Sequence, residues 1–395
     1  MEEKPFPPTN ASIFELSLCP TAATLFFLPT TYTLLFLTAL PGNALSLWVF
    51  LRRIPTASPT HIYLTHLSIS NLLLSLTAPF LVAYYARGSA WTRNAVQCQI
   101  VLHGITPVLH INIYISLMIL TCVALSRFAA LIQNTHASRP STCTMLLPNA
   151  FFSRLTRVSF AHSTCIVVWI VSVGAIVPVT VYYSVKEAMG SNSEETQEGG
   201  CMEMCYSPAV EIGGSFSATL TVPVITLFFI FYLMVLMSYM TVLRHIKRSR
   251  RNNSITNSHS LLSRVLRNIV VIQIVLSVCL LPYHIFKPIF ISLAHDEELT
   301  HSLSPQICTH CHPLSHLIEL KNCLFLLTAL RGSTDPVMYF VLDRTFRTQT
   351  LKLFRCNKKN DGKRHMFWSI TGSNIQKVEH LGETHVATAT MDLSH

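Results

Sequence analysis

The chain has 395 residues, of which half are hydrophobic and only 12% are charged. This composition excludes an ordinary soluble globular protein, in which about a quarter of the residues are charged. The formal net charge of +10 is compatible with nucleic-acid binding. We expect no nucleic-acid partner, however, because basic residues gathered in cytosolic loops are the ordinary mark of membrane topology. The composition therefore predicts a membrane protein whose surroundings are membrane lipids.

Apolar runs with short polar breaks between them recur along the whole chain. Each run is long enough to cross a hydrocarbon core of ~30 Å as a single α-helix. The predicted spans are 24–51, 60–86, 96–131, 161–185, 214–245, 265–294 and 314–341. No internal repeat and no matched pair of broken spans is found, which disfavours a carrier. We therefore predict an all-α membrane protein whose domain 24–341 is a seven-transmembrane helix bundle.

The segment 1–23 precedes the first span. It lacks the basic start and the apolar run of a cleavable signal peptide, so we expect the first span to act as its own insertion signal. Asn10 begins an Asn-Ala-Ser triplet, which is an acceptor sequence for an N-linked glycan. This segment is therefore predicted to be an extracellular, glycosylated N-terminus.

Charges in the loops predict the orientation of the bundle. The stretch 244–267 contains seven basic residues and no acid, whereas 185–212 contains six glutamates and a single lysine. Basic loops stay in the cytosol. Because the number of spans is odd, the N-terminus then lies outside and the C-terminus inside. We expect a multi-pass protein of the plasma membrane.

Residues 342–356 follow the last span and alternate basic with apolar side chains. On a helix these two sets separate onto two faces, which predicts a short amphipathic helix on the inner leaflet. Cys356 ends this segment and is a candidate for palmitoylation, with a free cytosolic thiol as the alternative. The remainder, 357–395, is polar and charged and is predicted to be a disordered cytoplasmic tail.

Sequence motifs on nearly every span resemble those of class A, or rhodopsin-like, G-protein-coupled receptors. They are Gly42-Asn43, Asn71 eight residues before Pro79, Trp91 before Cys98, Ser126-Arg127-Phe128, Trp169 and Pro178, Cys279–His284, and the Asp335-Pro336-Val337-Met338-Tyr339 segment. The Cys-Leu-Leu-Pro-Tyr-His segment, Lys287, Lys321 and the Asp-Pro form are similar to the purinergic-receptor branch. The resemblance covers about 24–356. It implies a receptor that transduces an extracellular ligand to heterotrimeric G proteins, with arrestin as a further cytosolic partner.

Several positions depart from the family pattern. Asn71 stands where the resemblance implies an aspartate that binds sodium inside the bundle, and the usual tryptophan of the sixth helix is missing. Arg331 lies four residues before Asp335, so both side chains share one helix face. We predict that the guanidinium pairs bidentately with the carboxylate and makes the receptor independent of sodium. The alternative is that Arg331 turns toward lipid or another helix.

Arg127 is expected at the cytosolic end of the third span. The resemblance implies that it contacts the G protein or restrains the inactive state, and that the hydroxyl groups of Tyr239 and Tyr339 bridge helices in the active state. It also implies that Pro282 of the sixth-helix motif belongs to the switch. The residue directly before Arg127 is Ser126 and not an acid, and no acid occurs in 244–267. The inactive state therefore lacks two ion-pair restraints, which predicts a raised basal activity. The alternative function is a non-signalling seven-helix membrane partner or scaffold protein.

Two lysines are predicted near the outer ends of the last two spans. Lys287 lies on a face related to that of Tyr283 and His284, and Lys321 lies on the seventh span. A charge within a span costs ~2.5–3.5 kcal/mol, so it normally faces a cavity or a partner. We predict that these four residues bind an anionic ligand, such as a phosphate, a carboxylate or an acidic lipid. The alternatives are that the lysines reach the lipid headgroups, or that Lys321 pairs with Glu319 or Glu211.

Half of the chain's 12 cysteines are expected on the oxidising side: Cys19, Cys98, Cys201, Cys205, Cys308 and Cys311. Spacing alone leaves their pairing open. The resemblance implies a bond from Cys98 to Cys205, and we expect Cys19 to pair with Cys311. The segment 308–312 also fits haem-attachment and zinc patterns, but a disulfide loop is preferred. We predict no metal, no cofactor and no enzymatic activity.

Overall fold

The structure is a computed structural model. It describes residues 21–54, 58–87, 95–136, 149–191, 215–251, 256–301 and 315–353 together with Arg355. Throughout these ranges the regular secondary structure is helical. The chain divides into two units, Met1–Leu342 and Asp343–His395, which are considered separately.

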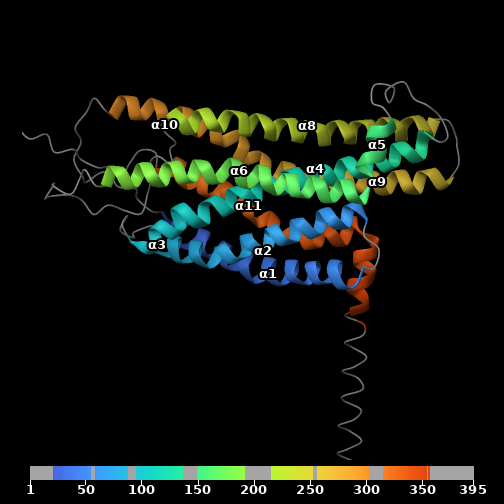
Figure 1. The fold of residues 1–395 in the computed structure, drawn as a ribbon, viewed down its shortest axis with the longest axis horizontal. Coiled ribbons are helices and arrows are strands. Elements are labelled where there is room, and N and C mark those ends of the chain that lie inside the picture. The colour runs from blue at the N-terminus through green and yellow to red at the C-terminus, as the bar shows by residue number, and fades with distance from the viewer. Residues whose placement is uncertain are drawn as a thin grey trace, which may run out of the picture. The chain divides into compact units, whose positions relative to one another are not determined.

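The first unit is a bundle of long helices that run back and forth (Figure 1). In the labels, η marks a π-helix. The elements that make up the first three predicted spans are η1 (Ala23–Phe27), α1 (Leu28–Arg52), α2 (Pro59–Ala86), α3 (Val96–Gln99), η2 (Ile100–Ile105) and α4 (Thr106–His136). The elements that follow are α5 (Asn149–Leu155), α6 (Val158–Ser191), α8 (Ser215–Arg251), α9 (Thr256–Val275), η4 (Leu276–Leu280), α10 (Leu281–His301) and α11 (Ser315–Leu342).

Six helical stretches within the described residues are long and apolar enough to cross a membrane. They are Ala23–Arg52, Pro59–Ala86, Val96–Gln133, Val158–Tyr182, Val222–Arg244 and Val265–Leu293. The helix α11 is a further long helix, and its charged residues include Arg331 and Asp335. Both of these side chains are fully buried, so their charges are kept away from lipid. Together these helices cover the seven predicted spans, and α6, α8 and α9 extend several residues beyond them.

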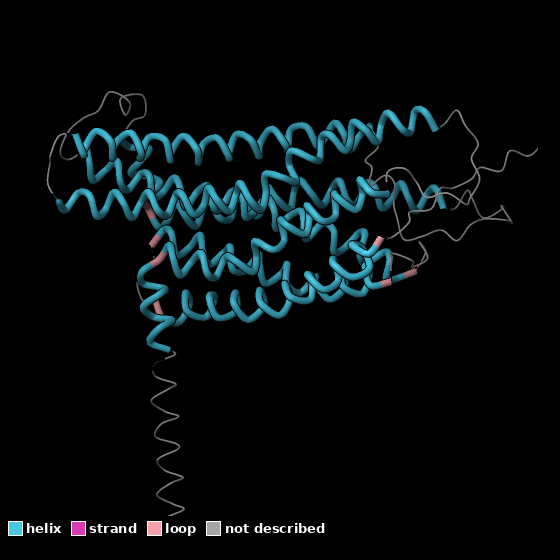
Figure 2. Tube along the Cα trace, turned by 180° about the vertical axis from the view of Figure 1, so that it is seen from behind, coloured by secondary structure: helices cyan, strands magenta, loops and turns pink. Residues whose placement is uncertain are grey.

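Successive long helices alternate in direction, as the colour gradient in Figure 1 shows. The bundle therefore has two ends, which Figure 2 shows from behind. We call the end at which α1 begins and at which Cys98 lies the Cys98 end. The opposite end, where α4 finishes, is called the Arg127 end.

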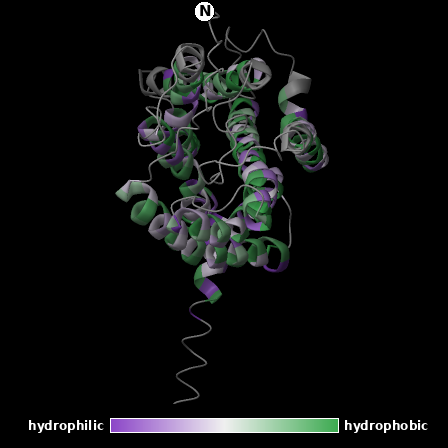
Figure 3. Ribbon diagram, turned by 90° about the vertical axis from the view of Figure 1, so that its left-hand side faces the viewer, coloured by the Kyte–Doolittle hydropathy of each residue, from purple (hydrophilic) through white to green (hydrophobic). Residues whose placement is uncertain are grey.

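The helix α4 lies at the centre of the packing. It contacts α2, α6, α8, α9 and α11, while α1 packs on α2 and α11. Many large apolar side chains on α1, α6 and α8 are exposed. Figure 3, seen along the helices, shows hydrophobic residues all around the bundle. Such surfaces are unfavourable in water and suit contact with lipid.

Two glycines allow α11 to approach its neighbours closely. A Cβ atom on Gly42 of α1 would lie 3.0 Å from Pro336 Cγ, and one on Gly332 of α11 would lie 3.1 Å from Leu74 Cδ2. Both distances are shorter than ordinary van der Waals contact. The absence of a side chain at these positions therefore brings α1, α2 and α11 together.

Two π-helical turns interrupt the spans at informative places. The first, η2, lies early in the third span, and the second, η4, directly precedes α10 and Pro282. A π turn takes in an extra residue, and proline removes a backbone hydrogen bond, so both weaken regular helix geometry. The sixth span is therefore irregular just before Tyr283 and His284.

In the second unit, residues 344–353 are helical, as predicted for the segment after the last span. Asp343 caps this helix, since its Oδ1 accepts a hydrogen bond of 2.8 Å from the backbone N–H of Phe346. Its backbone carbonyl accepts a further bond of 3.1 Å from the N–H of Arg347. A side-chain oxygen at this position satisfies an N–H that has no partner within the helix.

Candidate functional site

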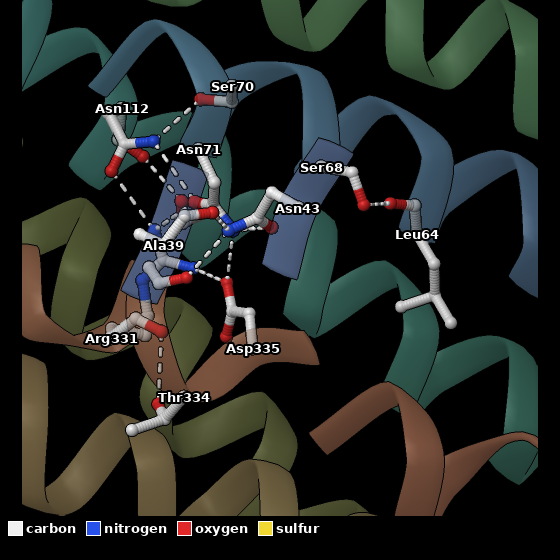
Figure 4. Close-up of polar contacts among 12 residues, drawn as sticks. Ala39, Asn43, Leu64, Ser68, Ser70, Asn71, Asn112, Arg331, Thr334 and Asp335 are labelled. Atoms are coloured by element: carbon white, nitrogen blue, oxygen red, sulfur yellow. Dashed lines mark hydrogen bonds and ion pairs between the residues drawn. The ribbon is translucent and has the colours of Figure 1, made fainter. Parts of the chain in front are cut away.

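Polar side chains from four helices meet in the interior of the bundle (Figure 4). We call this set the polar network: Asn43 of α1, Asn71 of α2, Asn112 of α4, and Arg331 and Asp335 of α11. All five residues are buried, with at most 2% of any of them exposed. Buried polar groups are stable only when they bond to each other or to water. The contacts within the network are therefore strongly constrained.

The guanidinium of Arg331 is the centre of the network. Its Nη1 donates to Asp335 Oδ2. Its Nη2 donates to Asn71 Oδ1 at 3.1 Å and to Asn112 Oδ1 at 3.0 Å. The predicted ion pair forms, but the predicted bidentate geometry is wrong, because the amide oxygens of α2 and α4 draw Nη2 away from the carboxylate. The burial of Arg331 also excludes the alternative in which it faces lipid.

The asparagines connect the remaining helices to α11. Asn71 Nδ2 donates to Asp335 Oδ2 at 2.7 Å and to Asn43 Oδ1 at 3.1 Å. Asn43 Nδ2 in turn donates to the backbone carbonyl of Gly332 at 2.8 Å. In the sequence, Asn43 was named only as part of a family motif. Its hydrogen bonds to Asn71 and to Gly332 were not predicted.

Two buried atoms of the network have no hydrogen-bond partner within the described parts of the chain. They are Asp335 Oδ1 and Arg331 Nε. An unsatisfied buried polar atom is costly and usually indicates bound water or another small ligand. The network therefore has unused capacity for hydrogen bonding.

The predicted ligand-binding lysines lie toward the Cys98 end, on α10 and α11, and are partly buried. The Nζ atom of Lys287 lies 5.7 Å from the centre of the Tyr283 ring. The Nζ atom of Lys321 lies 5.3 Å from the centre of the Phe290 ring. A cation within about 6 Å of a ring face is attracted by the π electrons. Both ammonium groups are thus stabilised by cation–π contacts with aromatic rings of α10.

Further aromatic side chains extend this group of residues deeper into the bundle. The hydroxyl of Tyr283 lies 3.5 Å from His110 Nε2, and the ring of His110 is centred 5.0 Å from that of Phe325. His284 stacks on Phe228 with ring centres 3.8 Å apart. We call the two lysines and these rings the basic-aromatic cluster: Lys287, Lys321, Tyr283, His284, His110, Phe228, Phe290 and Phe325. In the sequence Phe228 and Phe325 are indistinguishable from ordinary core aromatic residues.

Glu319 of α11 holds the beginning of the first helix. Its Oε1 accepts hydrogen bonds from the backbone N–H of Thr24 at 2.9 Å, from Thr24 Oγ1 at 2.8 Å, and from Thr21 Oγ1. A carboxylate at a helix N-terminus satisfies free N–H groups and complements the helix dipole. One carboxylate oxygen of Glu319, the residue considered as a partner for Lys321, is thus engaged with the first helix.

At the Arg127 end, the short helix α5 packs against the end of α4. Ala129 and Ile132 of α4 form a hydrophobic cluster with Phe152 and Leu155 of α5. The ring of Phe128 lies 6.2 Å from that of Phe152. Arg127 itself is partly buried directly before this cluster. The packing of α5 therefore fixes the surroundings of Arg127.

The two tyrosines that were expected to bridge helices occupy different helices. Tyr339 of α11 is fully buried, with its hydroxyl 3.5 Å from Asn71 Nδ2 and its ring 5.8 Å from that of Phe50. Tyr239 is partly buried on α8. Tyr339 thus belongs to the side of the bundle formed by α1 and α2. A bridge between the two tyrosines stays a prediction.

Comparison with known proteins places this architecture in a family. The family described as 7 transmembrane receptor (rhodopsin family) matches residues 42–339, which include most of the bundle. The chain belongs to this family. Its members are receptors and not enzymes, and G-protein signalling is their shared function.

Relatives of this rhodopsin-family receptor include proteins with named ligands. The chain is 37% identical to the human "Probable G-protein coupled receptor 82" over 83% of its own length and 91% of the relative's. It is 36% identical to the mouse protein of the same name, over 86% and 96% of the two chains. It is 26% identical to the human "Uracil nucleotide/cysteinyl leukotriene receptor", over 84% and 77%. The predicted similarity to the purinergic-receptor branch is confirmed.

Several predicted positions of the receptor lie outside the described residues. Cys98, in α3, is disulfide-bonded, and its partner lies in one of the undescribed ranges. The other predicted modification and disulfide positions in those ranges are Asn10, Cys19, Cys201, Cys205, Cys308, Cys311 and Cys356. Their pairing and modification stay predictions.

Proposed function

We propose that this receptor lies in the plasma membrane with the Cys98 end outside, binds an extracellular anionic ligand, and activates G proteins from the Arg127 end. The orientation is supported by the basic stretch 244–267, which includes the end of α8 and the start of α9 at the Arg127 end. It is also supported by the acidic stretch 185–212, which begins in the last part of α6 at the Cys98 end. In this orientation 1–23 is extracellular, and 342–356 and 357–395 are cytosolic.

The placement of Lys287 and Lys321 over aromatic rings is the observation that carries the ligand proposal. Both ammonium groups lie over aromatic rings of α10, at the end of the bundle proposed to be outside. Two cations at the same end of the bundle suit a phosphate or carboxylate group, and aromatic rings suit an apolar or planar portion of the same molecule. Uracil nucleotides and cysteinyl leukotrienes, after which a relative is named, are both anions. We therefore propose an anionic ligand with an aromatic or lipid-like body, bound with Tyr283 and His284.

The Arg127 end supplies the surface proposed for cytosolic partners. Ser126 precedes Arg127, so the chain has no acid immediately before the arginine to restrain it. A two-state receptor with fewer restraints on its inactive state has a larger active population without ligand. We propose a raised basal activation of G proteins, with arrestin binding at the same end.

Basal G-protein activation in cells tests this function without a known ligand. The receptor and each class of heterotrimeric G protein would be co-expressed with a sensor of subunit dissociation, at matched surface expression. We expect a basal signal above that of cells without the receptor, and Arg127→Ala should abolish it. Arg53→Ala is the matched control, because Arg53 directly follows α1 at the same end of the bundle and its Cζ lies 4.9 Å from the centre of the Trp48 ring.

The alternative function, a non-signalling partner or scaffold, makes the opposite prediction. The absence of basal dissociation with every G-protein class, in cells where the receptor reaches the surface, would favour it. Equal signals from the wild type and Arg127→Ala would show that the activity does not pass through the proposed coupling residue.

A further inference from the structure

The surroundings of the Arg331 guanidinium resemble those of a bound cation. Three oxygen atoms from three helices face it: Asp335 Oδ2, Asn71 Oδ1 and Asn112 Oδ1. Carboxylate and amide oxygens are also the ligands that hard metal cations take. The guanidinium thus occupies a cage of oxygen atoms.

The cage is held in place by contacts that do not involve Arg331. The amide nitrogen of Asn71 is engaged by Asn43 Oδ1 and Asp335 Oδ2. The amide nitrogen of Asn112 donates to Ser70 Oγ at 2.8 Å. Because each amide nitrogen is bound elsewhere, each amide oxygen is directed toward the guanidinium. Removal of the arginine side chain would therefore leave the oxygen atoms in position.

The charges of the polar network balance only while the guanidinium is present. Asp335 contributes one negative charge, Arg331 one positive charge, and the three asparagines none. Asp335 Oδ1 adds a further acceptor, which has no partner among the described residues. Without the guanidinium, the cage would hold one uncompensated, fully buried negative charge, which demands a counter-ion.

We propose that these oxygen atoms form a monovalent-cation site whose resident cation is the guanidinium of Arg331. In the intact receptor the Arg331 guanidinium occupies the site, so no free cation binds there. Truncation of Arg331 opens it to free guanidinium or sodium. The net charge of the empty cage favours a monovalent over a divalent ion. This inference goes beyond the proposed function, because it requires neither an anionic ligand nor a G protein.

Thermal unfolding of purified receptor in detergent tests the site directly. A thiol-reactive fluorogenic dye would report unfolding through the free cysteines inside the bundle, Cys122, Cys165, Cys279 and Cys323. The wild type should unfold at the same temperature in sodium chloride and in N-methylglucamine chloride. Arg331→Ala should gain about 2 °C or more in its midpoint when sodium or millimolar guanidinium is added, as expected for a ligand that binds the folded state.

Two controls separate site binding from general salt effects. Urea has the planar shape of guanidinium without its charge and should not stabilise Arg331→Ala. Arg331→Ala/Asp335→Asn lacks the carboxylate and should lose the response to both cations.

Two results would overturn the proposal. One is a sodium-specific stabilisation of the wild type, which decides the question even if the variants do not fold. The other is folded Arg331→Ala that responds to neither cation. A wild type that is insensitive to sodium supports the proposal if folded Arg331→Ala responds to a cation, or if the variants do not fold. All of these outcomes are independent of whether the receptor activates G proteins.

Discussion

At the scale of single residues, the polar network shows what one sequence can and cannot predict. The spacing of four residues on one helix was sufficient to predict that Arg331 contacts Asp335. It was not sufficient to predict that Nη2 binds Asn71 and Asn112, because those contacts depend on how α2 and α4 are rotated toward α11. That rotation is set by packing across the bundle, including the close approach at Gly332.

The buried ion pair predicts strongly non-additive effects on stability. Asp335→Asn leaves a fully buried guanidinium without its counter-ion and should lower the free energy of unfolding by about 3–5 kcal/mol. Arg331→Met/Asp335→Asn removes both charges and should recover much of this loss. The thermal midpoint of the purified variants measures both effects. Equal destabilisation of the single and double variants would contradict the pairing.

The lysines predict the response to an anionic agonist. Lys287→Ala should weaken any such agonist about 10–100-fold, because a hydrogen bond to a charged group contributes about 1.5–3 kcal/mol. Concentration–response curves for G-protein activation by uracil nucleotides and cysteinyl leukotrienes would provide the measurement. Lys352→Ala is the matched control, because this exposed lysine lies in the second unit. An agonist with the same potency on Lys287→Ala and the wild type would count against the proposed contact.

At the scale of helices, the apolar runs predicted the elements well and their irregularities poorly. The helices cover all seven predicted spans, and six of them are long and apolar enough to be identified as membrane-crossing helices from length and hydropathy. The turns η2 and η4 were not predicted, because one extra residue in a turn leaves the apolar pattern almost unchanged. The close packing at Gly42 was also invisible, because a glycine in a helix gives no sign of what lies opposite.

The contact of α1 with α11 predicts different effects for two similar substitutions. Gly42→Ala places a methyl group against Pro336 and should destabilise the receptor by about 1–3 kcal/mol. Gly174→Ala on α6 meets nothing within 4 Å. It should be neutral or stabilising by up to about 1 kcal/mol, because alanine favours a helix over glycine. Unfolding midpoints of the two variants provide the comparison, and equal midpoints would show that α1 and α11 are not closely packed.

The capping of the first helix by Glu319 predicts a local change in dynamics. Glu319→Gln weakens the charge-assisted hydrogen bonds to Thr21 and Thr24, so backbone amides in Ala23–Phe27 should exchange with solvent faster. Hydrogen–deuterium exchange with peptide resolution measures this change. His316→Ala, an exposed position on the same helix, should leave the exchange unaltered. Unchanged exchange in Glu319→Gln would show that other contacts hold the helix.

At the scale of the whole bundle, the buried polar network lies between two different ends. The basic-aromatic cluster lies toward the Cys98 end, Arg127 lies at the opposite end, and α4 and α11 contribute residues to the polar network between them. Their positions suit a receptor that passes a signal along its helices. Which end faces outward follows from the charges of 185–212 and 244–267, and so rests on the sequence.

The side of the membrane on which each terminus lies is the most direct test of this account. Epitope tags placed at residues 1 and 395 would be stained in intact and in permeabilised cells. We predict that the N-terminal tag is stained in intact cells and that the C-terminal tag is stained only after permeabilisation. Staining of both tags on the same side would contradict the seven-helix topology, and staining of only the C-terminal tag in intact cells would contradict the proposed orientation.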